Sequence, residues 1–376
     1  MSKKVFDVAY LTTDSVSEGV GSSQILPLLF RISKLGLKVN LVSFEKVSPS
    51  NSLKEALSKS GIVWNMREFK SNGISGGFSR LFEIRNQIPS AHVLHARSDV
   101  PAAAAGFFKH APVLWDIRSL WSEQKSYIES NLLKKKLLVG NRLFENFAAG
   151  NSDAINTLTH AVVPILEKRH RNLPEIRSVV PTTVDLNVFK IQVSSSQQKV
   201  AFFSGTYNSY YDLDLTAKFI SDYRKSGQLE VVWAKPRESD RNGLGLLEKV
   251  IHLKSQEEMS VAIGRSSFGV AVCKMDAGES LKASMPTKIA EFLACGKPVL
   301  INKGLGDFDA YIREFNAGVI LESDLDIRSG VEQMRQLLND PDTALRCRAL
   351  ASRYLSLDSG VKEYLRIYES LGKFSI

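Results

Sequence analysis

The chain has few cysteines, and they are scattered. Its 376 residues include Cys273, Cys295 and Cys347, and no two of them form a Cys-x-x-Cys pair. This spacing excludes a disulfide framework and gives no support to a zinc site. We therefore expect small buried thiols in a reducing compartment, and hence a cytoplasmic protein.

Long apolar runs are also missing. The first residues, MSKKVFDVAYLTTD, contain an apolar run of strand length and then turn polar. They predict neither a signal peptide nor a membrane span. The hydrophobic fraction of 44% and the charged fraction of 24% are typical of globular proteins, which excludes disordered and fibrous classes. The length suits two domains.

The positive charge is unevenly distributed. Residues 1–180 hold 24 Lys and Arg against 15 Asp and Glu, whereas the remainder holds 25 of each. A basic half beside a neutral half suggests that the first domain meets an anionic partner, such as a phospholipid surface, a lipid phosphate or nucleic acid. The alternative is a basic surface that only keeps the protein in solution.

Short apolar runs alternate with helical stretches along the chain. Strand-like runs in the first half are VFDVAYL, LKVNLVSF, IVWNMREF, HVLHAR, APVLWDI, AINTLT and IRSVVP. Those in the second half are KVAFFSG, LEVVWAK, KVIHLKS, FGVAVCKM, KPVLINKG and AGVILE. Such alternation predicts α/β domains with parallel sheets.

A polar stretch divides the two series of strands. Residues 187–199 (NVFKIQVSSSQQK) are typical of a linker. We expect an N-terminal Rossmann-like domain over 1–190 and a second Rossmann-like domain over 191–355. A C-terminal helix over 356–376 is expected to return to the first domain. Ligands of parallel sheets bind beyond the carboxyl ends of the strands, so a cleft between the two sheets is the expected site.

The segment 280–307, SLKASMPTKIAEFLACGKPVLINKGLGD, is the most informative one. Ser284 suits a helix N-cap, Pro286 suits the first helical position, and Gly296 suits the helix end. The first turn, with Thr287 and Lys288, would offer backbone N–H groups and a positive charge to a diphosphate. Glu291, one turn later, would accept hydrogen bonds from the two ribose hydroxyls. A plain capped helix with a surface lysine and glutamate is the alternative.

This segment resembles the donor-site signature of the retaining family-4 glycosyltransferases, which have the GT-B fold. The family pattern of a helix carrying glutamate and then small-Ala-x-Gly-x-Pro-Val reads here ProThrLysIleAlaGluPheLeuAlaCysGlyLysProVal. Four further segments resemble the family in the same order along the chain: GVGSSQILPLL, HARSDVPA, WDIRSLWSE and VVPTTVDLNVF. The resemblance implies an acceptor-side Rossmann-like domain over 1–190 and a domain over 191–355 that binds a nucleotide-sugar donor, with no cofactor and no obligatory metal. It also implies that the loop with Gly19 and Gly21 approaches the donor phosphates.

The chain departs from the family pattern at two places. The first of two glutamates eight residues apart falls at Ala283, so that the donor-sugar contact is missing or is supplied by another residue such as Glu279. The basic pair usual after the first strand of the second domain is replaced by SGTYNSYYD. There Tyr207 or Tyr210 would stack near the base, and Lys235 or Arg237 would supply the positive charge.

Catalysis requires stabilisation of the charge on the leaving phosphate. We assign this to the helix start at Pro286–Lys288, to Lys288 itself and to backbone N–H groups near Gly21. In the first domain, Asp116 would orient or deprotonate the acceptor hydroxyl, and Arg97 and Arg118 would hold an anionic acceptor or assist the phosphates. An internal Asp–Arg pair that fixes adjacent loops is the alternative, and His95 is expected to be a hydrogen-bonded core histidine.

Two other motifs have simpler explanations. Asp307-Phe308-Asp309 resembles a metal-binding Asp-x-Asp but is better explained as an Asp-capped helix start. Residues 131–147, NLLKKKLLVGNRLFENF, predict a basic amphipathic helix. It would rest on anionic lipid at the inner face of the membrane, or would simply expose a solvated basic face.

The leading hypothesis is transfer of a sugar to a glycan or polyprenyl-linked acceptor in bacterial cell-surface polysaccharide synthesis. A GT-B-fold sugar-nucleotide epimerase would share nucleotide binding but would need no acceptor. A non-catalytic protein that binds membrane or nucleic acid is the third reading. No stripe of interleaved aromatic and basic residues supports nucleic-acid stacking, so nucleic acid is not an expected partner.

Overall fold

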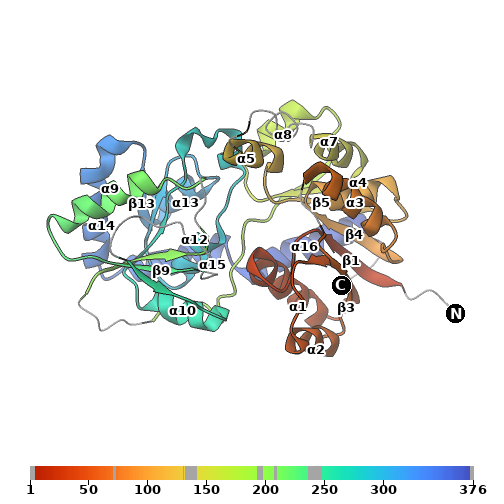
Figure 1. Cartoon of the computed structure of the whole chain (residues 1–376), viewed down its shortest axis with the longest axis horizontal. Helices are drawn as coiled ribbons and strands as arrows, with labels where there is room; N and C mark the ends of the chain where they lie inside the picture. Colours follow the sequence, from red (N-terminus) through yellow and green to blue (C-terminus); the bar gives the residue numbers. More distant parts are fainter. Residues whose placement is uncertain are drawn as a thin grey trace. The chain divides into compact units, whose positions relative to one another are not determined.

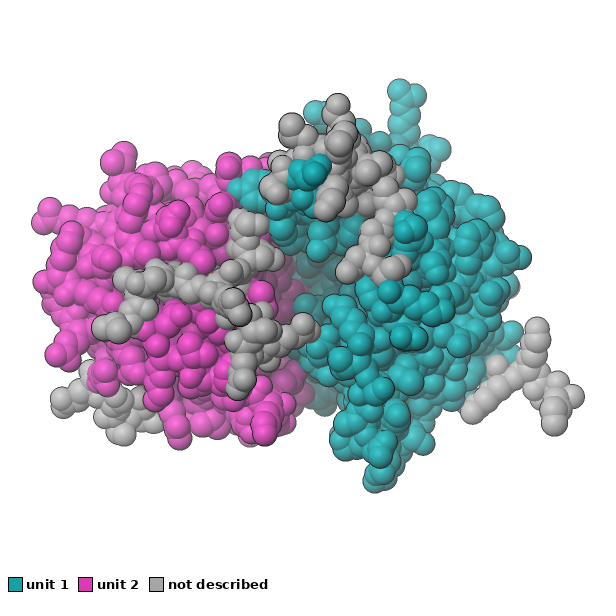
Figure 2. All heavy atoms as spheres, viewed as in Figure 1, with its two compact units in different colours: residues 1–181, 357–376 teal, residues 182–356 magenta. Residues whose placement is uncertain are grey.

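The computed structural model describes residues 5–70, 73–129, 131, 142–192, 198–206, 210–235 and 248–372. By their internal contacts the residues divide into two compact units, Met1–Pro181 with Leu357–Ile376, and Thr182–Ser356. Figure 1 traces the chain, and Figure 2 colours the two units. Residues 182–190, which the sequence reading assigned to the first domain, belong to the second unit.

The first unit is built on a parallel sheet of seven strands in the order β3-β2-β1-β4-β5-β6-β7. The strands are β1 (Phe6–Thr12), β2 (Val39–Glu45), β3 (Val63–Glu68), β4 (Ala91–Arg97), β5 (Val113–Ile117), β6 (Ala154–Thr157) and β7 (Ile176–Val179). Its helices are the π-helical turn η1 (Gly21–Ile25), α1 (Leu26–Lys34), α2 (Asn51–Lys59), α3 (Gly73–Arg85), α4 (Asp99–Phe107), α5 (Trp121–Ile128), α7 (Arg142–Asn151), α8 (Val163–Arg169) and α16 (Leu357–Leu371).

The second unit repeats the plan with six parallel strands in the order β10-β9-β8-β11-β12-β13. The strands are β8 (Val200–Ser204), β9 (Glu230–Ala234), β10 (Lys249–Ile251), β11 (Phe268–Ala271), β12 (Val299–Asn302) and β13 (Gly318–Leu321). Its helices are α9 (Leu213–Arg224), α10 (Gln256–Gly264), η2 (Met275–Ala277), α11 (Glu279–Lys282), α12 (Thr287–Ala294), α13 (Phe308–Phe315), η3 (Asp324–Asp326), α14 (Ile327–Asn339) and α15 (Thr343–Tyr354).

The strands that the sequence predicted are all present, and the two-sheet fold class is confirmed. Central strands such as β2 and β5 are buried along their whole length. This burial explains why most of their residues are apolar, because both faces of a parallel sheet are covered by helices.

Each sheet has a point where the strand order reverses. In the first unit it lies between β1 and β4, and in the second between β8 and β11. Loops after these strands run to opposite faces of the sheet, which leaves a crevice at the carboxyl ends where such folds bind ligands. The loop with Gly19 and Gly21 follows β1, and the loop with Gly205 follows β8.

The last helix, α16, packs within the first unit, as the sequence led us to expect of the C-terminal segment (Figure 1). It contacts α1 and β7 and contributes Leu357, Val361, Tyr364, Ile367 and Tyr368 to the core. These positions recur every three or four residues, the spacing of one helix face. The core of the first unit is therefore completed by a helix that follows the whole second unit in the sequence.

Candidate active site

The start of α12 differs from the sequence prediction. Pro286, with φ −59° and ψ 124°, is the N-cap, and the helix begins at Thr287. Ser284 is not the cap: its hydroxyl donates to the carbonyl of Ser280 at 2.7 Å and so belongs to the end of α11. The extended ψ of Pro286 separates two helices where one was expected. Gly296 ends α12 as predicted, in the left-handed region at φ +72°.

Lys288 lies in the first turn of α12 and is 9% exposed. Its Nζ lies 4.5 Å from the centre of the Tyr211 ring, over the face of the ring. A Cβ on Gly205 would come within 3.8 Å of the same Nζ, so the loop after β8 passes beside it. Burial lowers the pKa of Lys288 to about 7. An anion bound here would favour the charged amine.

Glu291 lies one turn further along α12 and is also 9% exposed. Burial raises the pKa of its carboxyl to about 7, against the opposing effect of Lys288. The two residues thus place one cation and one carboxyl in a buried setting at the switch point of the second sheet. Perturbed pKa values of this kind concentrate at functional sites.

The loop after β8 contributes Tyr210 and Tyr211, of which only Tyr210 was predicted from the sequence. The Tyr210 hydroxyl lies 3.0 Å from Ser284 Oγ and 3.3 Å from Ser280 Oγ, and its ring is 4% exposed, so its role is to fix α11 and not to stack on a base. Tyr211, which sequence reasoning missed, lies against Lys288. Tyr207 lies outside the described residues.

The other donor-side predictions fall at separate places. Lys235 follows β9, with its Nζ 4.3 Å from the centre of the Trp233 ring, while Arg237 lies outside the described residues. Ala283 is 2% exposed, so its methyl group fills core space where the family pattern has a glutamate. Glu279 is the exposed first residue of α11.

The glycine loop of the first unit owes its shape to both of its glycines. Gly19 has φ +58°, a left-handed conformation that favours glycine. Gly21 is buried, and a Cβ there would lie 1.9 Å from the carbonyl oxygen of Ser15. The turn around Ser15 therefore packs directly on the backbone of Gly21.

The structure brings the first-unit candidates together around Asp116, which is fully buried at the end of β5. Its carboxylate lies 3.4 Å from Arg118 Nη1 and 3.9 Å from Arg97 Nη1. Arg97 also donates through Nε to Asp14 at 3.0 Å. Although burial alone would raise the pKa of Asp116, Arg118, His95 and Arg97 hold it well below its usual range.

Three further residues, none of them predicted from sequence, complete this network. Asn156 Nδ2 donates to Asp116 Oδ1 at 2.7 Å, and the Tyr364 hydroxyl donates to Asp116 Oδ2 at 3.2 Å. Tyr368 lies 2.6 Å from His95 Nδ1, and His95 Nε2 lies 3.3 Å from Asp116. His95 is thus a hydrogen-bonded core histidine. The full set of partners around Asp116 favours the internal ion pair over the proton acceptor.

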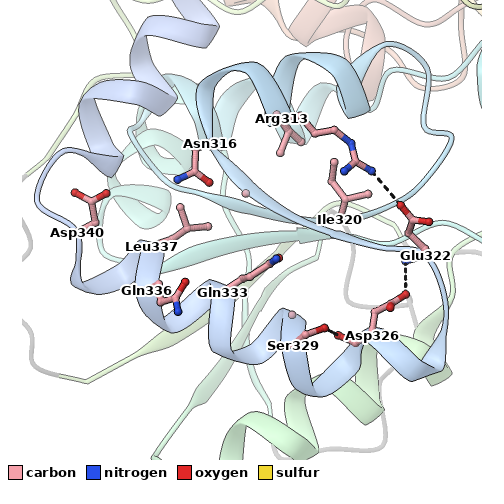
Figure 3. Close-up of a pocket in the computed structure, with 13 residues that line it drawn as sticks. Arg313, Asn316, Ile320, Glu322, Asp326, Ser329, Gln333, Gln336, Leu337 and Asp340 are labelled. Carbon is pink, nitrogen blue, oxygen red and sulfur yellow. Dashed lines mark hydrogen bonds and ion pairs between the residues drawn. The ribbon is translucent and has the colours of Figure 1, made fainter.

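The cavity shown in Figure 3 lies elsewhere in the second unit, with a volume of about 710 Å³. It follows the edge strand β13 between α13 and α14, and β12 separates that strand from the switch point. Arg313 and Glu322 pair across its wall at 3.1 Å. None of the predicted site residues lines it.

The structure also bears on the remaining motifs. Asp307 occupies the N-cap of α13 without a capping bond from its side chain, and Asp309 accepts from the backbone N–H of Gly304 at 2.8 Å. Among the described residues, no group of three or more potential ligands is arranged to hold a metal ion. Of the predicted helix 131–147, residues 132–141 lie outside the described residues. No helix in the described part of the chain is long and apolar enough to cross a membrane.

Comparisons with known proteins agree with this geometry. Residues 187–353 match the family model of glycosyl transferases group 1, while no curated protein matches the sequence. Among solved structures, the sucrose-phosphate synthase of Thermosynechococcus elongatus is similar, with a TM-score of 0.72 and 11% identity over 97% of this chain and 99% of that one. HepE of Anabaena, solved with UDP and glucose, has a TM-score of 0.70 and 12% identity over 97% and 100%.

WaaG, a glycosyltransferase involved in lipopolysaccharide biosynthesis, is similar with a TM-score of 0.67 and 14% identity over 97% of this chain and 99% of that one. Identities this low show the shared fold, and the family match places the α12 segment within a glycosyltransferase domain. Residues 187–353 therefore match the domain of glycosyl transferases group 1, and the chain has the two-sheet fold of the GT-B glycosyltransferases to which it is similar.

Proposed function

We propose that this chain transfers a sugar from a nucleoside diphosphate donor to a glycan or polyprenyl-linked acceptor, with retention of the anomeric configuration, in cell-surface polysaccharide synthesis. The observation that carries the proposal is the buried pair Lys288 and Glu291 at the start of α12. This segment lies within the matched residues 187–353. The solved complex of HepE with UDP and the role of WaaG in lipopolysaccharide biosynthesis support the choice of donor and pathway.

Lys288 is assigned to the leaving diphosphate. Breaking the bond between the anomeric carbon and the phosphate oxygen leaves negative charge on that oxygen, and a fixed cation in a buried site stabilises it strongly. The first N–H groups of α12 lack partners within the helix and add the positive end of its dipole. Tyr211 holds the amine in place through its ring face.

Glu291 is assigned to the ribose of the donor. A carboxylate one turn from the diphosphate site accepts hydrogen bonds from two adjacent hydroxyls, and charge-assisted bonds of this kind are strong. Ser284, Pro286 and Thr287 shape the turn that leads into α12, and Lys235 is a secondary source of positive charge. No metal or cofactor has a step in this scheme.

Arg97 and Arg118 are assigned to binding an anionic acceptor. Asp116 is assigned to holding the two arginines in place. Arg118 keeps its Nε buried without a hydrogen-bond partner among the described residues, while its Nη1 is fixed by Asp116 and Tyr364. A planar guanidinium of this kind suits a phosphate or carboxylate oxygen. The acceptor hydroxyl would then lose its proton to the departing diphosphate. Asp116 is not assigned this role, because its oxygens already accept hydrogen bonds from Arg118, Asn156 and Tyr364.

A peripheral contact with anionic membrane is supported by one surface of the first unit. Phe78 and Phe82 on α3, Phe107 on α4 and Leu143 on α7 are exposed. Phe78 and Phe107 contact the rings of Phe144 and Phe147, which both belong to α7. Lys70, Arg85 and Lys109 flank them. Exposed aromatic and basic side chains together favour a lipid interface. This contact would place the enzyme in the cytoplasm at the inner face of the membrane.

The experiment is an activity screen of the purified chain. UDP-, GDP-, dTDP- and ADP-sugars are offered with and without short lipid-linked glycans, in EDTA, and products are followed by mass spectrometry and by NMR of the new anomeric centre. We expect one donor to be used, with its configuration kept. Inversion of that centre would refute the retaining assignment.

The same screen separates the other two functions. Conversion of the donor into a stereoisomer without acceptor would identify an epimerase. Failure to consume any donor, together with sedimentation on phosphatidylglycerol vesicles but not on phosphatidylcholine vesicles, would favour a membrane-binding protein.

A further inference from the structure

Glu45 is a buried carboxylate that the proposed chemistry does not use. It ends β2 at 4% exposure. Its oxygens accept hydrogen bonds from five donors, four of which belong to the loop after β1. The donors are Ser15 Oγ at 2.6 Å, Ser17 Oγ at 2.6 Å, the Ser17 N–H at 3.2 Å, the Val16 N–H at 3.0 Å and Ser43 Oγ at 2.7 Å.

These bonds keep the carboxylate ionised. Burial alone would raise the pKa of Glu45, but the hydroxyl groups of Ser15, Ser17 and Ser43 and the N–H of Val16 lower it. Hydrogen bonds to an ionised acceptor are about twice as strong as neutral ones. The turn at residues 15–17 is therefore attached firmly to the end of β2.

That turn in turn supports the glycine loop. The Cβ that Gly21 lacks would lie 1.9 Å from the Ser15 carbonyl oxygen and 2.7 Å from Val16 Cα. Further along, Ser22 Oγ donates to the carbonyl of Gly19 at 2.9 Å. A displacement of the turn would therefore move the backbone from Gly19 to Ser22.

We infer that Glu45 is a positioning residue for the transfer reaction: it fixes the turn at residues 15–17, and the turn fixes the Gly19–Gly21 backbone, which follows β1 at the switch point of the first sheet. This inference rests on the proposed function. A purely structural carboxylate would affect only the stability of the fold, whereas a positioning residue also affects the turnover of the folded enzyme.

The chain offers a matched control. Glu68 ends β3 and is the register partner of Glu45 across the pair of strands, but it is exposed. Glu45→Gln and Glu68→Gln thus remove the same charge at the same level of the sheet. The amide of glutamine keeps one acceptor oxygen and cannot satisfy all the donors that a carboxylate satisfies.

The test compares both variants at a temperature where each is folded. A misplaced loop should lower kcat of Glu45→Gln about 100-fold, while the Kd for the nucleoside diphosphate stays within twofold because the second unit binds it. Glu68→Gln should match the wild type. Ser15→Ala combined with Ser17→Ala should lower kcat as well, and should add little on top of Glu45→Gln because the residues act as one unit.

Each outcome has a definite reading. A Glu45→Gln enzyme whose kcat per folded molecule equals that of the wild type overturns the inference, and if that variant does not fold, the serine double variant decides in the same way. A wild-type chain that consumes no donor refutes the proposed function first, and the inference falls with it.

Discussion

Replacing Lys288 by methionine should stabilise the empty protein and at the same time abolish its response to a nucleoside diphosphate. The amine is 9% exposed, and burial lowers its pKa from 10.5 to about 7. Since one pKa unit is worth about 1.4 kcal/mol, holding the charge in the empty site costs at most about 5 kcal/mol. Methionine has similar length and no charge, so we expect the free energy of unfolding to rise by about 1–3 kcal/mol after relaxation of the site.

The pH dependence of stability provides a second test of the expected stability difference between the wild type and Lys288→Met. The folded pKa of Lys288 lies below that of the unfolded chain, so the unfolded chain binds more protons between pH 7 and 10.5. The wild type should therefore gain stability relative to Lys288→Met as the pH rises through this window. The difference between the two proteins should be largest at pH 7 and below.

The assay is urea unfolding at pH 6, 7.5 and 9, with and without the nucleotide. Lys282→Met is the matched control, because Lys282 is an exposed lysine at the end of the neighbouring helix α11. We expect it to change neither the stability nor the nucleotide response. A Lys288→Met protein that is less stable than the wild type at pH 6 and still responds fully to the nucleotide would refute the reasoning.

Three further predictions follow from single contacts. Glu291→Gln should weaken UDP binding about 10- to 100-fold and remove the preference for UDP over 2′-deoxy-UDP, as measured by calorimetry; a retained preference would disprove the ribose assignment. Gly21→Ala should lower kcat at least tenfold, because its Cβ would meet the Ser15 carbonyl. At Gly19 a new Cβ would meet no atom within 4 Å, so Gly19→Ala should cost only about 1 kcal/mol of backbone strain. Equal kcat values for the two variants would contradict this prediction. Asp116→Asn should cost about 3–5 kcal/mol in urea unfolding because it leaves Arg97 and Arg118 without their carboxylate, and the difference from wild type should shrink as the pH falls below 3.8; a constant difference would argue against the ion pair.

The fold was predictable from the sequence because its signal is local and repeated. Most strands are short runs rich in apolar residues, and the central strands β2 and β5 are buried on both faces of the sheet, which favours that composition. The sequence predicts the N-cap of α12 at Ser284, two residues before the observed cap Pro286, because serine is a favoured capping residue, whereas the Ser284 hydroxyl in fact donates to the carbonyl of Ser280. The N-cap preference of serine did not apply here, because the side chain of Ser284 is bonded to the preceding short helix α11.

The missed site residues come from contacts that no local pattern encodes. Tyr364 lies 248 positions from Asp116 in sequence, and Glu45 lies 30 positions from Ser15. In α16 the tyrosines show only the spacing of a buried helix face, which does not reveal that their hydroxyls reach a polar network. A charged residue at the end of a buried strand rich in apolar residues, as in β2, was the one available signal for Glu45.

Nucleotide binding by the second unit is the central claim, and one measurement tests it directly. The melting temperatures of the wild type, Lys288→Met and Glu291→Gln are recorded in EDTA with UDP, GDP, dTDP, CMP and ADP. A ligand that binds only the folded state raises the melting temperature by mass action. The account predicts that one nucleoside diphosphate stabilises the wild type, that Lys288→Met does not respond to it and that Glu291→Gln responds less than the wild type. Stabilisation of all three proteins to the same extent, or of none of them, would contradict it.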